Sequence, residues 1–171
     1  MRNIVASSES PVFLVGALTD SDLCNYLWEM QRSKDKSTVI RACRAQKMRN
    51  MSRLFDEIAA AFQFPYYFGE NWAALEDCMS DLSWLYAEFY LICITSSEDL
   101  LCEEDEVVFG HFVRSLVSIA NGWAGANPNL ALLGRVATPF RVLFQVLPGK
   151  EEEMRKKLLT FGVHSDLLER E

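Results

Sequence analysis

Acidic side chains near the middle of the chain recur at the spacing of one helix face. A helix that begins near Asn71 places six residues together on one side: Ala73, Glu76, Asp77, Ser80, Asp81 and Trp84. The opposite side is apolar. Carboxylates grouped without a neutralising lysine attract a cationic cleft on another protein. The alternative is that this face is the solvated side of an ordinary amphipathic helix.

The charge is distributed unevenly along the 171 residues, which carry a formal net charge of −7 at pH 7. From Tyr66 to Glu106 there are eleven Asp or Glu residues and no Lys or Arg, whereas Gln31 to Arg53 holds eight Lys or Arg and one acid, Asp35. Affinity for nucleic acid comes from Lys and Arg, so the overall balance argues against a general nucleic-acid binder and favours a cationic partner. The cation-free run also favours a functional acidic face, because solvated faces usually mix both signs.

An aromatic turn, Phe64-Pro65-Tyr66-Tyr67-Phe68, comes directly before the acidic helix. Gly69 permits a positive φ, and Asn71 can cap the helix with its side chain. Aromatic residues held in a loop by a rigid scaffold are common binding elements, although they can also close the bottom of a core. We predict an interface role for Tyr67 and core positions for Phe68 and Trp72.

The sequence offers little for catalysis or metal binding. Its two histidines, His111 and His164, stand in no recognisable catalytic context, and His111 is expected on the surface of an amphipathic helix. No phosphate-binding, dinucleotide-binding or metalloprotease motif occurs. Glu76 and Asp77 are adjacent and could form an acid–base pair, but the sequence indicates no cleft around them. We predict no enzyme activity, no catalytic residue, no metal and no cofactor.

The five cysteines are widely spaced and form no CxxC pair. This pattern is typical of free, mostly buried thiols in a reducing compartment. The short apolar stretch from Val12 to Leu18 follows a single basic residue, Arg2, and is interpreted as a strand rather than a signal peptide. No apolar run approaches the roughly 20 residues of a membrane helix. The predicted location is cytoplasmic, without a membrane.

Strands and helices are expected to alternate. Apolar runs predict strands at 12–15, 38–46, 89–95 and 140–147, and helical periodicity predicts helices at 19–30, 51–62, from 71, at 107–123 and at 151–160. The runs 38–46 and 89–95 (FYLICIT) are interpreted as buried strands. Residues 1–10 are expected to be loose and the tail after 160 polar. This order predicts the α/β class with a small, largely parallel sheet.

The segment FPYYFGENWAALEDCMSDLSWL, from Phe64 to Leu85, resembles the signature of the barstar family, the intracellular inhibitors of secreted ribonucleases. The family pattern is close to P-x-Y-Y/F-G-x-N-L/W-D-A-L-x-D. It is matched here without a gap by Pro65, Tyr67, Phe68, Gly69, Asn71, Trp72, Ala74, Leu75 and Asp77. A weaker resemblance covers residues 37–147, and the continuation after Asp77 is similar to the larger bacterial members.

The resemblance implies a three-stranded, mainly parallel sheet flanked by helices, or a four-stranded one if the N-terminal strand joins it. It implies an inhibitor whose aromatic loop and acidic helix enter a ribonuclease active site, where carboxylates stand in for phosphate oxygens. The implied contact residues are Tyr67, Gly69, Asn71, Glu76, Asp77, Ser80, Asp81 and Trp84. Tyr67 would be the aromatic anchor and Asp77 the central carboxylate. The partner would be a basic ribonuclease, a toxin to which this protein gives immunity.

The chain departs from the family pattern at the acidic face. Ala73 stands where the family usually has Asp, and Glu76 lies on the same predicted face and could replace that charge. No acid follows Glu106 in the helix before the last strand, where the family has a further acidic contact. An alternative function is therefore a regulatory binding module for another basic protein. A further alternative uses the basic residues 32–53 to contact RNA or an acidic partner, although these residues could equally surround a strand end and cap a helix.

The predicted organisation has three parts. Residues 1–36 form an N-terminal extension, a strand plus a short helix, that packs on the barstar-like domain at 37–147. Residues 148–171 form a C-terminal helix and tail. The extension either adds its strand and helix to the sheet or mediates self-association.

Overall fold

A parallel sheet forms the centre of the molecule, in a computed structural model that describes residues 12–32, 37–126 and 136–168. Its strand order is β2-β3-β4-β1-β5, and every pairing is parallel. The strands are β1 (Phe13–Ala17), β2 (Thr38–Arg44), β3 (Phe89–Thr95), β4 (Phe140–Val146) and β5 (Asp166–Leu167). The predicted α/β class with a parallel sheet flanked by helices is confirmed, with more strands than the resemblance implies.

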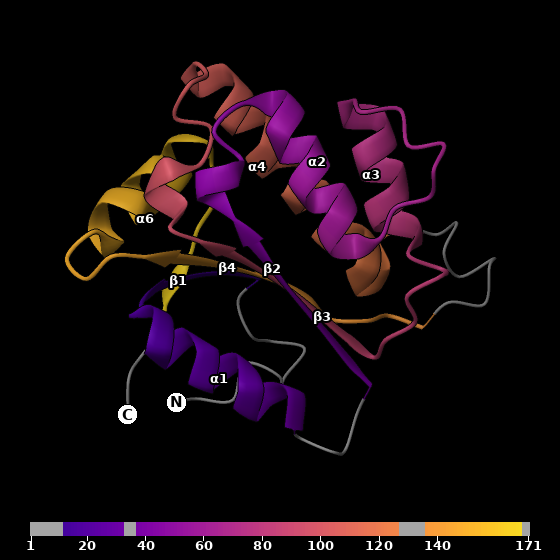
Figure 1. Cartoon of the computed structure of the whole chain (residues 1–171), viewed down its shortest axis with the longest axis horizontal. Helices are drawn as coiled ribbons and strands as arrows, with labels where there is room; N and C mark the ends of the chain where they lie inside the picture. The colour runs from indigo at the N-terminus through magenta and orange to yellow at the C-terminus, as the bar shows by residue number, and fades with distance from the viewer. Residues whose placement is uncertain (1–11, 33–36, 127–135, 169–171) are drawn as a thin grey trace.

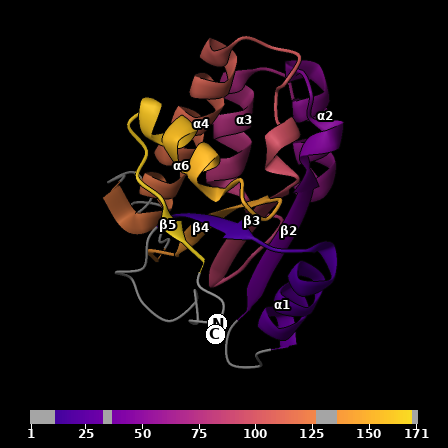
Figure 2. The ribbon, with the colours of Figure 1, turned by 90° about the vertical axis from the view of Figure 1, so that its left-hand side faces the viewer.

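Helices cover both faces of this sheet. They are α1 (Asp20–Arg32), α2 (Met51–Phe62), α3 (Trp72–Asp81), α4 (Glu106–Asn121) and α6 (Glu151–Thr160), with short turns η1 (Ala45–Lys47), η2 (Ser97–Asp99) and η3 (Gly122–Ala126). In Figure 1, α2, α3 and α4 lie above the sheet and α1 lies below it. Figure 2 shows α6 on the same side as α2, α3 and α4. Because both faces are covered, all seven residues of β4 are buried.

The larger core lies under α2, α3, α4 and α6. Side chains of the central strands alternate between the two faces, so Tyr90 and Ile92 enter the larger core while Leu91 and Cys93 enter the smaller core under α1. The aromatic rings of Tyr90 and Trp123 pack 4.8 Å apart, between centroids, within the larger core. This packing provides the rigid base from which α3 and its preceding loop project.

The N-terminal strand and helix belong to the sheet and its second face. In β1, Val15 pairs in register with Phe144 of β4 and with Leu167 of β5, so β1 lies inside the sheet rather than at its edge. Leu23 and Tyr26 of α1 are buried in the smaller core. Within residues 12–32, β1 thus joins the sheet and α1 packs on its second face. The predictions for residues 1–10 and for most of the turn before β2 lie outside the described residues.

Two strand predictions need correction. The prediction of a buried strand at 38–46 is wrong, because β2 is the edge strand of the sheet and Cys43 is its one fully buried residue. The polar tail contains a strand, β5, that the sequence pattern misses. Its two exposed residues carry no apolar alternation, and their pairing with Leu14 and Val15 alone defines them as a strand.

The cysteines form no disulfide within the described residues. Cys43, Cys78 and Cys93 are buried, Cys24 and Cys102 are exposed, and all five are free thiols, as predicted. Burial raises the pKa of the Cys93 thiol to about 12, so this thiol stays protonated. Over the described ranges, no three His, Cys, Asp or Glu side chains gather in a way that could hold a metal. In the same ranges, no helix has the length and apolar character needed to span a membrane.

Candidate functional site

Two phenylalanines hold the loop between α2 and α3 to the molecule. Gln63 ends α2 in the left-handed region, with φ of 54°, and the amide of Phe64 donates to the carbonyl of Ala59 at 2.9 Å. The rings of Phe64 and Phe68 meet edge to face with centroids 4.9 Å apart, and Phe68 meets Phe55 of α2 in the same way. Phe68 therefore packs against the core, as predicted, and both ends of the loop are fixed.

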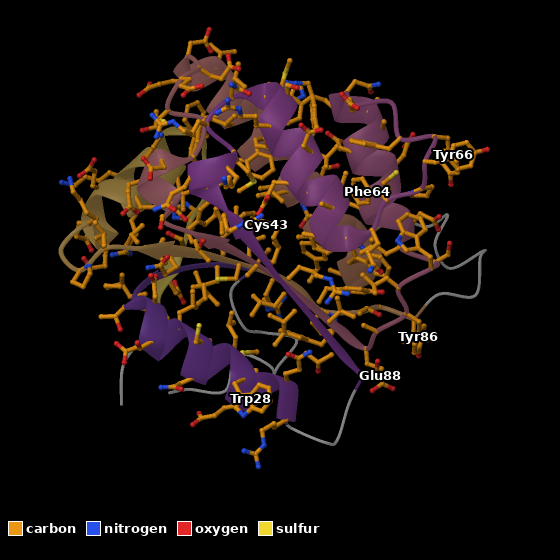
Figure 3. All side chains as sticks on the ribbon, in the orientation of Figure 1. Trp28, Cys43, Phe64, Tyr66, Tyr86 and Glu88 are labelled. Carbon is orange, nitrogen blue, oxygen red and sulfur yellow. The ribbon has the colours of Figure 1, made fainter. Side chains whose placement is uncertain are left out.

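Tyr66 and Tyr67 form the outer corner of this loop. The amide of Phe68 donates to the carbonyl of Pro65 at 3.0 Å, which closes a four-residue turn with the two tyrosines at its central positions. Tyr66 is fully exposed and Tyr67 is 68% exposed. Figure 3 shows Tyr66 pointing away from the helices, whereas Phe64 turns toward them. The prediction from sequence covers Tyr67 and misses Tyr66, although a tight turn exposes both of its corner residues.

Asn71 joins the loop to α3. Its side-chain oxygen accepts a hydrogen bond from the amide of Ala74 at 3.0 Å, as predicted for an N-cap, and its side-chain nitrogen donates to the carbonyl of Gly69 at 2.9 Å. A Cβ on Gly69 would lie 2.9 Å from Nδ2 of Asn71, so a larger residue there would displace the Asn71 side chain from this position. The positive φ expected at Gly69 belongs instead to Glu70, at 47°. Gly69 and Asn71 are both exposed, and together they set the shape of the loop.

One face of α3 presents carboxylates one turn apart. Ala73, Asp77 and Asp81 are exposed and follow each other at i, i+4 spacing, with Ser80 half-buried beside them. Oδ2 of Asp81 accepts a hydrogen bond from the hydroxyl of Ser83 at 3.1 Å. Asp77 forms no ion pair or hydrogen bond with another described residue. The acidic stripe predicted for this helix is therefore exposed at two of its three carboxylates.

The charges of these two aspartates are placed unfavourably for the helix that carries them. Asp77 and Asp81 are like charges one turn apart, a spacing that costs an isolated helix about 0.2–0.5 kcal/mol. Asp81 also lies at the C-terminal end of α3, where the helix dipole disfavours an anion. By contrast, α4 and α6 carry acidic residues in their first turns, where the dipole favours them. Helix electrostatics therefore do not account for the aspartates of α3.

Two of the implied contact residues turn inward. Glu76 is half-buried, and its Oε1 accepts a hydrogen bond from the hydroxyl of Ser115 on α4 at 2.6 Å. Trp84 lies beyond α3, because Leu82 adopts a left-handed φ of 40° and ends the helix; the wheel placement of Trp84 on the acidic face is therefore wrong. The indole nitrogen of Trp84 donates to the carbonyl of Phe62 at 3.0 Å. A helical wheel shows neither the helix end nor the serine that α4 brings opposite Glu76.

Ion pairs away from α3 account for part of the uneven charge. Arg49 lies 3.3 Å from Asp99 and 2.9 Å from Glu103, measured between side-chain nitrogen and oxygen atoms, and its hydrogen bond lowers the pKa of the Glu103 carboxyl. Arg44 lies 2.7 Å from Glu57 of α2. Two arginines of the basic segment thus pair with acidic residues of η2 and α2 in the same chain. This agrees with the alternative in which the basic residues surround a strand end rather than contact RNA.

An aromatic stack fixes the N-terminal end of α3 against α4. The rings of Trp72 and His111 are stacked with centroids 4.7 Å apart and an interplanar angle of 25°. Trp72 also meets Phe55 of α2 edge to face at 5.0 Å. Trp72 packs against the core and His111 is exposed, as predicted for both. The loop and the acidic face of α3 therefore form one rigid surface.

The chain was compared with protein-family models, curated proteins and solved structures. The family model described as Barstar (barnase inhibitor) matches residues 38–145. No curated protein matches the chain. Among solved structures, the chain is similar to a chain of "Structure of Drosophila ORC bound to AT-rich DNA and Cdc6", with 10% sequence identity and a TM-score of 0.46. That alignment covers 93% of this chain and 48% of the other, so this chain spans about half the length of that matching chain.

Proposed function

The chain belongs to the barstar family, and from that premise we propose that it inhibits a ribonuclease by covering the enzyme's active site. A ribonuclease binds the phosphates of RNA with cationic side chains. Carboxylates of an inhibitor at matching positions can therefore replace these phosphates. The observation that carries the proposal is the exposed face of α3, where Asp77 and Asp81 lie one turn apart at a cost to their own helix. The loop with Tyr66 and Tyr67 leads directly into this face.

The proposed contact surface has an aromatic part and an acidic part. Tyr67, with Tyr66 beside it, packs on the rim of the enzyme, where a rigid tyrosine contributes a large contact area. Asp77 is the central carboxylate and Asp81 the second one. The other implied residues hold or border this surface: Gly69 and Asn71 shape the loop, Glu76 fixes α3 to α4, and Ser80 and Trp84 lie at the margin.

We place this inhibitor in the cytoplasm of the cell that makes the ribonuclease, as the immunity partner of a toxin, and assign it no catalysis of its own. The free thiols support a reducing compartment. The acidic face supports rapid, salt-sensitive association with a basic enzyme, because opposite potentials steer the encounter.

The test is a ribonuclease assay with the purified chain. The enzyme is a basic ribonuclease of the kind that barstar-family proteins inhibit. Its hydrolysis of RNA should fall in proportion to the added chain, and the rate of association should drop as the salt concentration is raised. Tyr67→Ala should weaken inhibition without lowering the melting temperature, because the Tyr67 ring is mostly exposed and contacts Tyr66 alone among the described aromatic rings. Trp28→Ala on α1, which removes an exposed aromatic ring at the other face of the sheet, is a matched control that should leave inhibition unchanged. Equal loss of inhibition in both variants would refute the proposed surface.

A second candidate is a binding module that recognises another basic protein and does not inhibit a ribonuclease. Ala73 carries no charge and Glu76 is turned toward Ser115, so α3 presents fewer free carboxylates than the family pattern implies. The same assay separates the two functions, since a module would form a salt-sensitive complex with its partner and leave RNA hydrolysis unchanged.

A further inference from the structure

A cavity lies between α6 and the segment that leads into β5. Its volume is about 130 Å³, and its walls come from one stripe of α6 and from the three residues that precede β5. The lining residues are Glu152, Arg155, Lys156, Leu159, Val163, His164 and Ser165. This part of the chain lies outside the residues that the family model matches. Figure 1 places α6 at the opposite side of the molecule from α3, so the cavity is separate from the proposed inhibitory surface.

The walls of this cavity are firmly held. Beyond α6, the amide of Val163 donates to the carbonyl of Leu158 at 3.1 Å, and Gly162 adopts a positive φ of 77° that turns the chain back. Phe161 packs so closely on Gly110 of α4 that a Cβ at Gly110 would lie 2.4 Å from its ring. The following strand β5 is paired with β1. The cavity is therefore part of the fold rather than a gap between loose segments.

Two of the five polar residues around the cavity, Arg155 and Lys156, are cations, and one, Glu152, is an anion. Arg155 is half-buried; its Nε donates to the carbonyl of Ser165 at 3.3 Å and its Nη1 to Glu152 at 2.7 Å, which leaves Nη2 without a hydrogen bond to another described residue. Lys156 and His164 are exposed at the mouth and supply an ammonium and an imidazole N–H. The carboxylate of Glu152 is 63% exposed and lies against Arg155 at the rim. An arginine and a lysine on one wall favour an anionic ligand in a chain that is acidic overall.

A buried hydroxyl lines the same cavity. Ser165 is only 7% exposed, and its Oγ is shielded from solvent and has no hydrogen-bond partner among the described residues. A buried hydroxyl without a partner is unfavourable, so such groups are normally satisfied by a ligand oxygen or a bound water. In this structure the hydroxyl is covered, so it becomes a further donor for an oxyanion, beside Arg155 and Lys156, once its side chain rotates toward the cavity.

We propose that this cavity binds the phosphoryl group of a small molecule, either free phosphate or a phosphate monoester. A phosphoryl group has three or more acceptor oxygens and carries more than one negative charge near pH 7, so it can use the Arg155, Lys156, His164 and Ser165 donors together. A carboxylate has two oxygens and one charge, and leaves part of this donor set unused. Phosphate binding in this cavity is independent of the ribonuclease inhibition proposed for α3.

The two histidines allow a direct test by NMR. Inorganic phosphate is titrated into the full-length chain at constant pH and ionic strength, with chloride as the replaced anion, while the two imidazole signals are followed. The signals of His164, assigned with a His164→Gln variant, should shift and saturate. Those of His111, on α4 and stacked on Trp72, should not move. Equal shifts at both histidines, no saturation, or the same response to acetate would overturn the proposal. Parallel titration with glycerol 3-phosphate shows whether the cavity prefers free phosphate or a phosphate monoester.

Two variants test the donor set. Lys156→Gln should weaken phosphate binding about tenfold, whereas Lys47→Gln, an exposed lysine of η1 outside the cavity, should not. Ser165→Ala should also weaken phosphate binding, yet should not lower the melting temperature, because its hydroxyl has no protein partner to lose. Unchanged phosphate affinity in Lys156→Gln and Ser165→Ala would overturn the proposal and leave a water-filled cavity.

Discussion

Replacing Asp77 with Asn should stabilise the fold and weaken ribonuclease binding, two effects of opposite sign. Asp77 is exposed, has no ion pair with another described residue and repels Asp81 one turn away. The substitution keeps the size of the side chain and removes its charge, and Asp and Asn have similar helix propensities. Relief of the repulsion is worth about 0.2–0.5 kcal/mol. For a chain of 171 residues this raises the melting temperature by about 0.5–2 °C.

The expected loss of affinity is larger than the gain in stability. A hydrogen bond to a charged group contributes about 1.5–3 kcal/mol, so losing the contact between Asp77 and a cationic group of the enzyme should raise Kd about 10- to 150-fold. Calorimetric titration against a basic ribonuclease gives Kd, and thermal unfolding followed by circular dichroism gives the melting temperature. Glu29→Gln is the control, since it removes one exposed carboxylate from the other face of the sheet.

Two outcomes would refute this reasoning. A lower melting temperature in Asp77→Asn would mean that the carboxylate stabilises the fold, so that its position would need no functional explanation. An unchanged Kd together with a higher melting temperature would mean that the enzyme does not contact this residue. Raised salt should reduce both effects, because both are interactions of exposed charges.

Three further perturbations concern the fold that supports the surface. Leu75→Ala should cost about 2–5 kcal/mol in urea unfolding, because Leu75 is 1% exposed, and a loss below about 1 kcal/mol would contradict its core position. Gly69→Ala should displace the side chain of Asn71 and cost the α3 cap, about 0.5–2 kcal/mol; Asn71→Ala should cost the same, and additive losses in the double variant would rule out this shared origin. The hydrogen bond from Arg44 lowers the pKa of Glu57, so the stability from this carboxylate is present above its unfolded-state pKa of about 4.3 and is lost as pH falls through the lower folded-state pKa. The free energy of unfolding should therefore be lower for Glu57→Gln than for the wild type at pH 7, and a difference that does not shrink as the pH is lowered into the acid range would contradict this account.

Local sequence determines most of the helices and the shape of the binding loop. The bounds predicted for α2 and α6 are those of the structure, and the N-cap at Asn71 forms as its residue type predicts. These features depend on periodicity and on hydrogen bonds between residues a few positions apart, which are visible in a short stretch of sequence. The loop and Asp77 can be predicted in the same way, because they lie in one contiguous motif from Pro65 to Asp77.

Tertiary structure decides which of these residues face outward. The end of α3 at Leu82 removes Trp84 from the acidic face, and α4 brings Ser115 opposite Glu76, 39 positions away in sequence. A helical wheel contains neither fact, because both depend on segments that meet only after folding. The donor set of the cavity depends in the same way on where the segment after α6 is placed.

The sheet shows the same division between local pattern and long-range pairing. The apolar run of β3 marks it as a central strand, since burial on both faces requires apolar residues throughout. No pattern of residue types in the sequence indicates that β2 is an edge strand or that β5 exists. Both depend on whether another strand lies alongside. Local sequence patterns thus predict the helices, the central strand, the loop and the acidic stripe. Folding decided the edges of the sheet, the orientation of Glu76 and the cavity beside Ser165, because these arise from contacts between residues distant in the chain.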